Sequence, residues 1–582
     1  MIANKIKSQP KTFWKYAKSR LKCKSKIPTL IKEDSSRTSN SKEKAETLNN
    51  FFTSVFTVEN LENIPDMESI NETEPLLSIE ITPEMVQKKL ENLNSNKSPG
   101  HDNWHPFFLK QLSKIISVPL SLLFNKSLKE GAHSSWLKAV ISPIYKKGDK
   151  SLPNNYRPVS LTSVISKIME SILKDAILSH LSQNNLLHDD QHGFVPQRDC
   201  ITQLLLSLDE WTKMVENNEA FDIIYTDFSK AFDSVAHERL LLKLEKIGIG
   251  GDLLNWIRSF LTDRTQCVKI DGILSEWKSV SSGVPQGSVL GPLLFVIFIN
   301  DMPDEVKYNI CKLFADDCKI YGSVGTNDNN SLQLDLSRLE NWSKKWQLLF
   351  NVSKCKVMHL GRHNKRDDYT LYEKILEESQ KEKDLGAIID EQLKFHVQAA
   401  AATKKANQML GIIKKTYTSR DAVTMATLYK AMVRPHLEYG NVIWGPSFQG
   451  DIIAVERIQR RATRLIPELK NMPYQERLMN LKLLTLVYRR KRGDMIMIFK
   501  IMCGLVRIDV NKLFTNATIK KTRGHSKKVF KRHAIKTVRK HFFSQRIVND
   551  WNSLPEHVVE APSILEFKKR LDHHWKDRYF TL

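Results

Sequence analysis

The chain has 582 residues, of which 41% are hydrophobic and 26% are charged. That balance is typical of a folded protein and excludes global disorder, and the length predicts several domains or one large enzyme with appendages. The net charge is +24. Nearly all of it lies after residue 400, where about 37 Lys and Arg accompany about 14 Asp and Glu. A nearly neutral body with a strongly basic region favours a polyanionic partner, nucleic acid before membrane.

The seven cysteines include no CxxC pair, which argues against a zinc knuckle or a disulfide framework and favours a reducing compartment. The first residues, MIANKIKSQPKTFWKY, have no apolar core and are not a signal peptide. The longest uncharged apolar run, VLGPLLFVIFI, is too short for a bilayer and contains Pro292. We therefore expect an intracellular protein without a membrane partner.

The first third of the chain is expected to be mainly helical. Residues 1–75 are interpreted as an N-terminal extension or linker with one amphipathic segment, AETLNNFFTSVF. Helices are predicted at ITPEMVQKKLENLNSNKSPG, FFLKQLSKIISVPLSLLFNKSLKEG and VISKIMESILKDAILSHLSQ. The segment KAVISPIYKKGDK, between the last two, is predicted to be extended.

The middle of the chain alternates strands and helices. TQLLLSLDEWTKMVENN predicts a helix that leads into the strand FDIIYTDF, and HERLLLKLEKIGI predicts another helix. TQCVKIDGILSEWKSV predicts a hairpin that turns at Asp271-Gly272. KLFA and CKIYG are short strands around an Asp-Asp pair, NWSKKWQLLFN is a helix, and KCKVMHLG is a strand. With the nearly all-helical pattern after about Val397, this order predicts an α+β fold.

Three aspartates stand where strands end. Asp227 ends the apolar strand IIYTD, and Asp316 and Asp317 lie between two short strands. If those strands are neighbours, the three carboxylates converge, and their charges repel unless divalent cations neutralise them. Oxygen ligands select Mg²⁺ or Mn²⁺, and two such ions can hold the attacking and leaving oxygens of a phosphoryl transfer. The alternative is a strand terminator and an ordinary polar turn.

The loop SSGVPQGSVLGPLLF is the second candidate site. Its glycines allow the backbone to approach a ligand closely: Gly283, Gly287 and Gly291. Gln286 offers an amide to a sugar or phosphate. Asp233 is expected to cap the helix that follows it, and Asp301 and Asp304 are expected to be helix-end or loop residues.

The ordered set SPIYKKGD, NYRPVSL, QHGFVPQRDC, YTDFSKAFDSV, SGVPQGSVLGPLLF, LFADD and NVSKCKVMHLG resembles the reverse transcriptases of non-LTR retrotransposons, the LINE type, with the jockey-like branch the most similar. Similarity continues in YKAMVRPHLEYGNVIW, RIQRRATRLI, YRRKRGDMIMIFKIM and WNSLPEHVV, so it runs from about Ser98 to Arg578. Such relatives usually carry an endonuclease ahead of the polymerase, and we expect no room for one before Ser98.

The resemblance implies a right-hand polymerase of fingers, palm and thumb with a helical, basic C-terminal region. It divides the chain into an N-terminal extension (1–75), a helical N-terminal part of the fingers (76–125), fingers and palm (126–390), a helical thumb-like region (391–510) and a basic C-terminal region (511–582).

The implied activity is RNA-directed DNA synthesis. Two Mg²⁺ (or Mn²⁺) ions would bind Asp227, Asp316, Asp317 and the backbone carbonyl of Phe228, and dNTPs would be joined to the 3′-OH of a DNA primer or target DNA on an RNA template. The chain has FADD where many relatives have YADD; Phe314 lacks a hydroxyl but no carboxylate is lost.

The resemblance also implies a dNTP site. Lys146 or Lys147 and Arg157 would hold the triphosphate, since Arg offers a planar fork to phosphate oxygens. Gln286 would lie under the sugar, and Phe232 would be the aromatic steric gate that excludes a 2′-OH. The alternatives are a core aromatic for Phe232 and a solvated turn for the lysines.

Two further roles follow from the resemblance. Lys354 or Lys356 could donate a proton to pyrophosphate, although a surface lysine is an equal alternative. His359, Leu360 and Gly361 resemble the primer grip, where a turn of backbone supports the primer 3′ end.

The basic region is expected to bind nucleic acid. RIQRRATRLI presents an arginine face opposite its apolar residues, suited to a thumb helix on the template–primer duplex: Arg457, Arg460, Arg461 and Arg464. Trp444 and Trp551 are among aromatics that could stack on bases. Lys520 to Lys540 could be a nuclear-import signal or RNA tether, which favours a nuclear, otherwise cytoplasmic, ribonucleoprotein. The oligomeric state is not predicted.

The sequence disfavours two rival functions. A group II intron-like or retron-like reverse transcriptase is disfavoured by the segment from RPHLEYG to WNSLPEHVV, which resembles the LINE type. A nucleic-acid-binding protein that descends from a polymerase but no longer catalyses is disfavoured because all three aspartates are retained.

Overall fold

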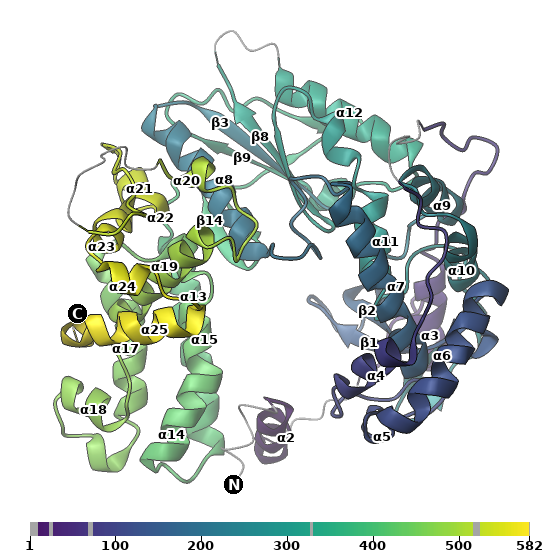
Figure 1. Ribbon diagram of the computed structural model, residues 1–582, viewed down its shortest axis with the longest axis horizontal. Helices are drawn as coiled ribbons and strands as arrows, with labels where there is room; N and C mark the ends of the chain where they lie inside the picture. The colour runs from purple at the N-terminus through teal and green to yellow at the C-terminus, as the bar shows by residue number, and fades with distance from the viewer. Residues whose placement is uncertain (1–9, 22–26, 68–73, 326–329, 516–523, 581–582) are drawn as a thin grey trace.

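The structure is a computed structural model that describes residues 10–21, 27–67, 74–325, 330–515 and 524–580. Figure 1 shows an arch in which a central sheet joins two limbs. One limb carries the elements between residues 83 and 161 together with several later helices, and the other carries the helices after residue 396. The predicted α+β class is confirmed.

The central sheet has the strand order β12-β9-β3-β8-β7. Its strands are β3 (Phe221–Thr226), β7 (Ile310–Phe314), β8 (Asp317–Ser323), β9 (Lys356–Leu360) and β12 (Glu377–Glu378). Strand β3 pairs antiparallel with both β8 and β9, and β7 forms an edge. The strands predicted from FDIIYTDF, KLFA, CKIYG and KCKVMHLG are all present.

A second sheet has the order β2-β1-β4-β5, with β6 also on β4. Its strands are β1 (Lys138–Tyr145), β2 (Tyr156–Leu161), β4 (Thr265–Ile270), β5 (Ile273–Leu274) and β6 (Lys278–Ser279). The predicted turn between β4 and β5 is confirmed, since Asp271 and Gly272 have φ of +50° and +90°. Two small hairpins were not predicted: β10 (Thr370–Leu371) with β11 (Lys374–Ile375), and β13 (Lys381–Asp384) with β14 (Ala387–Asp390).

The helices up to residue 345 include all the predicted ones. They are α2 (Pro10–Leu21), α3 (Ser41–Thr53), α4 (Pro83–Glu91), α5 (Pro106–Gln111), α6 (Ser113–Glu130), α7 (Val164–Gln183), α8 (Cys200–Glu216), α9 (His237–Lys246), α10 (Gly251–Leu261), α11 (Gly291–Phe298) and α12 (Ser331–Lys345). However, α2 and α10 were not predicted, α4 ends nine residues before its predicted segment does, and α12 begins ten residues before its own. Helix α12 ends before QLLFN, contrary to the prediction. Gln347 takes a φ of +54°, and Phe350 bridges to Phe228 beside the central sheet.

The chain after residue 395 is nearly all helical, as predicted. Its helices are α13 (His396–Thr416), α14 (Ala422–Leu428), α15 (Arg434–Glu438), α16 (Asn441–Trp444), α17 (Gln449–Thr463), α18 (Tyr474–Asn480), α19 (Leu486–Met502), α20 (Val510–Leu513), α21 (Thr537–Lys540), α22 (Phe543–Arg546), α23 (Val548–Asn552), α24 (Glu556–Val559) and α25 (Ile564–His574). A π-helical turn, Tyr429–Val433, lies between α14 and α15.

Helix α11 is the apolar run VLGPLLFVIFI, and it is a core helix whose side chains are buried. Across the described ranges, no helix is long and apolar enough to cross a membrane. Asp301 and Asp304 lie in the short 3-10 turn after α11, as predicted. Asp301 accepts hydrogen bonds from the buried Lys243 ammonium and from the Trp342 ring nitrogen.

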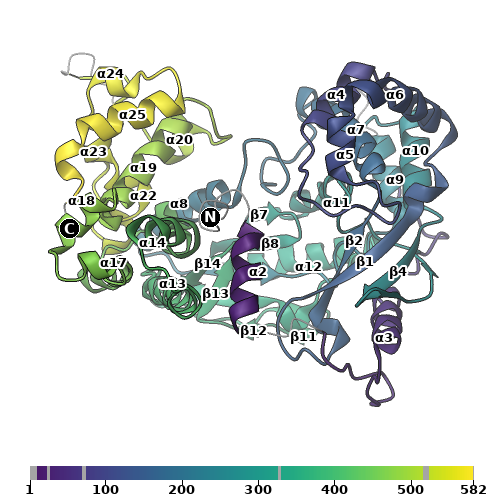
Figure 2. The ribbon, with the colours of Figure 1, turned by 90° about the horizontal axis from the view of Figure 1, so that it is seen from below.

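The described part of the N-terminal segment packs on the rest of the chain. Leu48 and Phe52 of α3 join a core cluster with Val268 and Ile270 of β4. Helix α2 lies beside α13 (Figure 2). Phe13 stacks on Tyr417, the residue after α13, with ring centroids 5.8 Å apart. The apolar face of AETLNNFFTSVF therefore packs against the second sheet.

The C-terminal helices dock on α8 through a buried carboxylate. Asp209 is 1% exposed and accepts hydrogen bonds from Arg539 Nη1 at 2.7 Å and Ser544 Oγ at 2.6 Å. Arg539, one member of the basic cluster before residue 541, is therefore a structural residue at this interface. Lys520 and Lys521 lie outside the described residues.

The variant Arg539→Met should lower the free energy of unfolding by about 3 kcal/mol, because the Asp209 carboxylate then loses its buried guanidinium and keeps the half-exposed Lys213, at 2.6 Å, as its cation. Urea denaturation measures the change. The control Lys569→Met removes a cation from an exposed pair with Glu566 at 3.8 Å and should change stability by less than about 1 kcal/mol. Equal losses in the two variants would contradict the interface described here.

Candidate active site

The register of the central sheet brings the three aspartates to one end. Tyr225 pairs with Lys319 and Thr226 with Cys318, so the next residue of the first strand, Asp227, lies opposite Asp317. Asp316 belongs to the two-residue turn that joins β7 to β8, because Phe314 pairs with Asp317. Directly opposed residues of antiparallel strands have Cβ atoms about 5 Å apart. The hypothesis that the two strands are neighbours is confirmed.

The electrostatics agree with this proximity. Desolvation raises the pKa of Asp317 to about 6, and the negative charges of Asp316, Asp384 and Asp227 add to the shift. Desolvation and the charge of Asp227 also raise the pKa of Asp316. Each carboxylate therefore makes ionisation of the next one less favourable.

Three cations face these carboxylates. Lys354 Nζ lies 2.8 Å from Asp227 Oδ1. Desolvation lowers the pKa of Lys146, and the charges of Arg157 and Lys354 lower it further. Lys146 and Arg157 in turn act against the rise in the pKa of Asp316.

These interactions distinguish Lys146 from Lys147 and Lys354 from Lys356, the two pairs between which the sequence left a choice. Lys146 and Lys147 are both exposed in the turn after β1, but it is Lys146 whose charge interacts with Asp227 and Asp316. Lys354 pairs with Asp227, whereas Lys356 pairs with Glu377 of β12. Lys146 and Lys354 are therefore the members of each pair that reach the carboxylates.

This end of the sheet has oxygen donors for a divalent ion but no assembled three-ligand site among the described residues. Within the described ranges, no three His, Cys, Asp or Glu side chains stand close enough together to hold a metal. The Lys354 ammonium donates a hydrogen bond to Asp227. Carboxylate oxygens are the ligand type that Mg²⁺ and Mn²⁺ prefer. The ring of Phe228 stacks on Phe350 at 4.6 Å and is buried, so Phe228 could contribute its backbone alone.

The Gly-Pro-rich loop uses two glycines to approach its own chain. A Cβ on Gly283 would lie 2.6 Å from the carbonyl oxygen of Phe232, and one on Gly287 would lie 2.4 Å from that of Ser160. Ser160 N donates to Gln286 O at 2.7 Å. These glycines therefore allow the loop to pack closely on β2 and on the 232–235 turn. The sequence pattern instead predicted close approach to a ligand.

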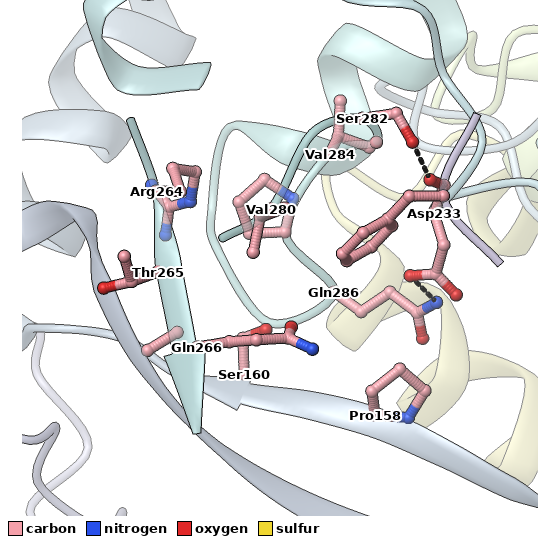
Figure 3. Close-up of a pocket in the computed structure, with 14 residues that line it drawn as sticks. Pro158, Ser160, Asp233, Arg264, Thr265, Gln266, Val280, Ser282, Val284 and Gln286 are labelled. Atoms are coloured by element: carbon pink, nitrogen blue, oxygen red, sulfur yellow. Dashed lines mark hydrogen bonds between the residues drawn. The ribbon is translucent and has the colours of Figure 1, made fainter. Parts of the chain in front are cut away.

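Asp233 does not cap a helix, so that prediction is wrong. Helix α9 begins four residues later, at His237, with Ala236 in the cap position. Figure 3 shows the Gln286 amide turned toward Asp233, and Gln286 Nε2 donates to Asp233 Oδ1 at 3.0 Å. Burial raises the pKa of Asp233 to about 6. The pocket in Figure 3 lies between this pair, Pro158 and Ser160 of β2, and the buried Arg264.

Phe232 precedes this pair and is half-buried. Its ring stacks on Phe295 of α11, with centroids 4.7 Å apart. One face of the ring is thus fixed by the core, which is compatible with both interpretations of this residue.

His359, Leu360 and Gly361 lie away from the carboxylates. Leu360 pairs with Phe221, at the opposite end of β3 from Asp227. His359 is buried, and its Nδ1 lies 2.8 Å from Asp222 Oδ1. These residues therefore do not reach the end of the sheet where the aspartates meet.

The unpredicted hairpin β13–β14 does reach that end. Glu382, Lys383, Asp384 and Leu385 line one pocket together with Asp227, Asp317 and Lys354. The hairpin turns at Leu385-Gly386, where φ is +44° and +92°. The sequence signal was the Leu-Gly pair between the short polar and apolar runs KEKD and AIID.

In the C-terminal part, the arginine face is exposed as predicted, but the two tryptophans expected to stack on bases are buried. The arginine face of α17 is exposed, and Ile458 and Ile466 are buried. Its members are Arg457, Arg460, Arg461 and Arg464. Trp444 and Trp551 are 1% and 0% exposed, so the suggestion that they stack on bases is wrong.

Comparison with known proteins agrees with the motif order. Residues 144–413 match the family model "Reverse transcriptase (RNA-dependent DNA polymerase)". Residues 144–413 are therefore similar to reverse transcriptase domains. They contain the three aspartates, Lys146, Arg157, Gln286 and Lys354. The predicted resemblance is thereby confirmed for the reverse transcriptase region.

Similar proteins come from mobile elements of Drosophila melanogaster. The chain is 29% identical over 388 residues to a "Probable RNA-directed DNA polymerase from transposon X-element", which covers 64% of this chain and 42% of that protein. It is 28% identical over 403 residues to the "RNA-directed DNA polymerase from mobile element jockey", over 66% of this chain and 44% of that one. The chain thus spans less than half the length of these relatives.

A solved structure of apo telomerase from Candida tropicalis is also similar. It has 16% sequence identity and a TM-score of 0.32, over 47% of this chain and 58% of that one.

The variant Asp317→Asn should stabilise the metal-free protein at neutral and higher pH. The folded pKa of about 6 lies above the ordinary value, so the destabilising charge is absent well below pH 4, grows with pH, and is complete above about 6. The melting temperature should therefore rise in Asp317→Asn at pH 8, and the gain should shrink as pH falls from 6 toward 4.

Differential scanning calorimetry across this pH range measures the gain. Glu130→Gln, on an exposed carboxylate at the end of α6, is the control and should show no such pH dependence. A gain in Asp317→Asn that stays constant down to pH 4 would contradict the raised pKa.

Proposed function

We propose that this chain is an RNA-directed DNA polymerase that joins dNTPs to the 3′-OH of a DNA primer on an RNA template. The observation that carries the proposal is the β3–β8 register, which sets Asp227 opposite Asp317 and beside the Asp316 turn. Carboxylates on one side and Lys146, Arg157 and Lys354 on the other suit a site for a nucleoside triphosphate and its counter-ions.

The proposed ion ligands are Asp227, Asp316, Asp317 and the backbone carbonyl of Phe228. Two Mg²⁺ or Mn²⁺ ions bound there would polarise the α-phosphate and stabilise the attacking and leaving oxygens. Lys354 occupies Oδ1 of Asp227, so Oδ2 would be the oxygen available to an ion. We propose that Lys354, rather than Lys356, gives a proton to pyrophosphate, because Lys354 is the lysine that contacts Asp227.

The nucleotide side of the site follows the second sheet. Arg157 pairs with Ile144 across β1 and β2, and Lys146 follows β1 directly. Both would hold the triphosphate, with Lys147 as a weaker candidate. Gln286, fixed by its bonds to Asp233 and Ser160, would lie under the sugar, and Phe232 would close the space beside its 2′ carbon.

The primer side is proposed at β13–β14. Its position beside Asp227 and Asp317 favours it over His359, Leu360 and Gly361 as the support for the primer 3′ end. The arginine face of α17 is proposed to follow the duplex as part of the thumb, within the division 391–510. A nuclear site of action on target DNA belongs to this proposal.

Primer extension tests the activity. The purified chain should extend a DNA primer on an RNA template with dNTPs and Mg²⁺, and Asp227→Asn and Asp316→Asn should each lower the rate by at least about 100-fold while template–primer affinity is kept. Asp304→Asn, outside the site, is the control. Binding without Mg²⁺-dependent synthesis would instead support the non-catalytic alternative.

The steric gate has a separate test. Phe232→Ala should raise incorporation of ribonucleotides relative to deoxyribonucleotides by about 10-fold or more, because an unoccupied volume then accepts the 2′-OH. The ratio of kcat/KM for dCTP and CTP measures it. Phe295→Leu, which alters the ring beneath Phe232, is a packing control, and an unchanged sugar preference in Phe232→Ala would refute the role.

A further inference from the structure

The motif QHGFVPQRDC, residues 191–200, lies against the turn that carries Asp316. Strand β7 is an edge of the central sheet, and its outer backbone groups need partners. Leu313 N donates to Asp190 O at 3.0 Å, and His192 N donates to Leu313 O at 2.9 Å. Residues 190–192 therefore add a short parallel bridge to the strand that ends at the aspartate turn.

The turn itself needs support. It has two residues, Ala315 and Asp316, and Ala315 takes a φ of +52°. That region is unfavourable for a residue with a side chain, and tight hairpin turns prefer Gly, Asn or Asp there. A turn of this kind persists when its surroundings hold it in place.

Gln191 supplies such a contact from its side chain. It is 0% exposed, and its Oε1 accepts hydrogen bonds from Ala315 N at 3.0 Å and Gly193 N at 2.7 Å. Its Nε2 is buried without a hydrogen-bond partner in the described part of the chain. The carbonyl oxygen is therefore the polar atom of Gln191 that the fold uses.

The approach of this segment to the turn is as close as a backbone allows. A Cβ on Gly193 would lie 2.3 Å from Ala315 N. Arg198 anchors the segment from the other side, where Nη1 donates to the carbonyls of Asp189 at 2.6 Å and Gln191 at 2.8 Å. Because Arg198 holds the segment in place, the hydrogen bond from Ala315 N to Gln191 Oε1 restrains the Ala315–Asp316 turn.

We propose that Gln191 is a positioning residue, whose side-chain carbonyl holds the Ala315–Asp316 turn so that the Asp316 carboxylate stays beside Asp227. The catalytic consequence rests on the proposed polymerase function, whereas the effect on the turn does not. Loss of the acceptor would leave Ala315 N buried without its partner and release the turn.

Hydrogen exchange of the metal-free protein tests the effect on the turn. Gln191→Leu, of similar volume but without an acceptor, should speed exchange of the Ala315 amide by about 10-fold or more. Gln191→Asn, whose oxygen is one methylene too short, should do the same. Gln191→Glu keeps an acceptor oxygen at the same reach and should retain protection.

Thr202→Val is the matched control. It removes a hydroxyl of α8 that lies 3.1 Å from His192 Nδ1 and accepts a hydrogen bond from Asp199 N, so it weakens the hold on the same segment without touching the Gln191–Ala315 bond. Protection of Ala315 should be unchanged in this variant. Unchanged Ala315 exchange in both Gln191→Leu and Gln191→Asn, or equal loss in Thr202→Val, would overturn the proposal.

Primer-extension kinetics test the consequence. Gln191→Asn should lower kcat by about 10- to 100-fold, raise the Mg²⁺ concentration for half-maximal rate, and leave the dNTP KM and template–primer Kd within about 2-fold. Gln191→Glu should recover most of kcat. Full activity in Gln191→Asn would overturn the positioning role. A wild-type protein that makes no DNA would instead refute the polymerase proposal, and Ala315 exchange would still decide whether Gln191 holds the turn.

Discussion

The repulsion among Asp227, Asp316 and Asp317 constrains everything around this end of the central sheet. The carboxylates lie on adjacent strands and a tight turn. The charge of Asp227 raises the pKa of Asp316, and the charges of Asp316 and Asp227 raise that of Asp317. A fold keeps such a cluster when rigid backbone pairing prevents the strands from separating. Here β3 pairs along its length with β8 on one side and β9 on the other.

The surroundings offset this repulsion in two ways. Lys354 pairs directly with Asp227, and Lys146 and Arg157 act on Asp316 from the second sheet. The 190–193 segment closes the open edge of β7 and fixes the turn that carries Asp316. Charge compensation and backbone support thus come from segments that are distant in the sequence but meet at one place.

Much of this could be predicted from local pattern. The apolar run FDIIYT ending in Asp227, the strands around Asp316-Asp317 and the turn at Asp271-Gly272 depend on neighbouring residues, which the sequence displays directly. The adjacency of β3 and β8 and their register depend on long-range pairing. From the sequence, the three aspartates converge only if the two strands are neighbours. The pairing of β3 with β8 in the structure meets that condition.

The errors have the same physical origin. A helix follows Asp233 in the sequence, which predicted a helix cap, but the chain first turns through 233–236 before α9 begins. The partner of Asp233 is Gln286, about 50 residues later in the chain. Trp444 and Trp551 lie among basic residues in sequence but point into the core. In each case a tertiary partner decided the role.

Iron-mediated backbone cleavage tests the central claim most directly. Fe²⁺ can replace Mg²⁺ at oxygen-ligand sites, and with peroxide and ascorbate it cuts the chain next to where it is bound. The account predicts two coincident cuts, near residue 227 and near residues 315–318, both suppressed by excess Mg²⁺ and both lost in Asp227→Asn. Cleavage at one segment alone, or cuts that persist in Asp227→Asn, would contradict a shared ion site.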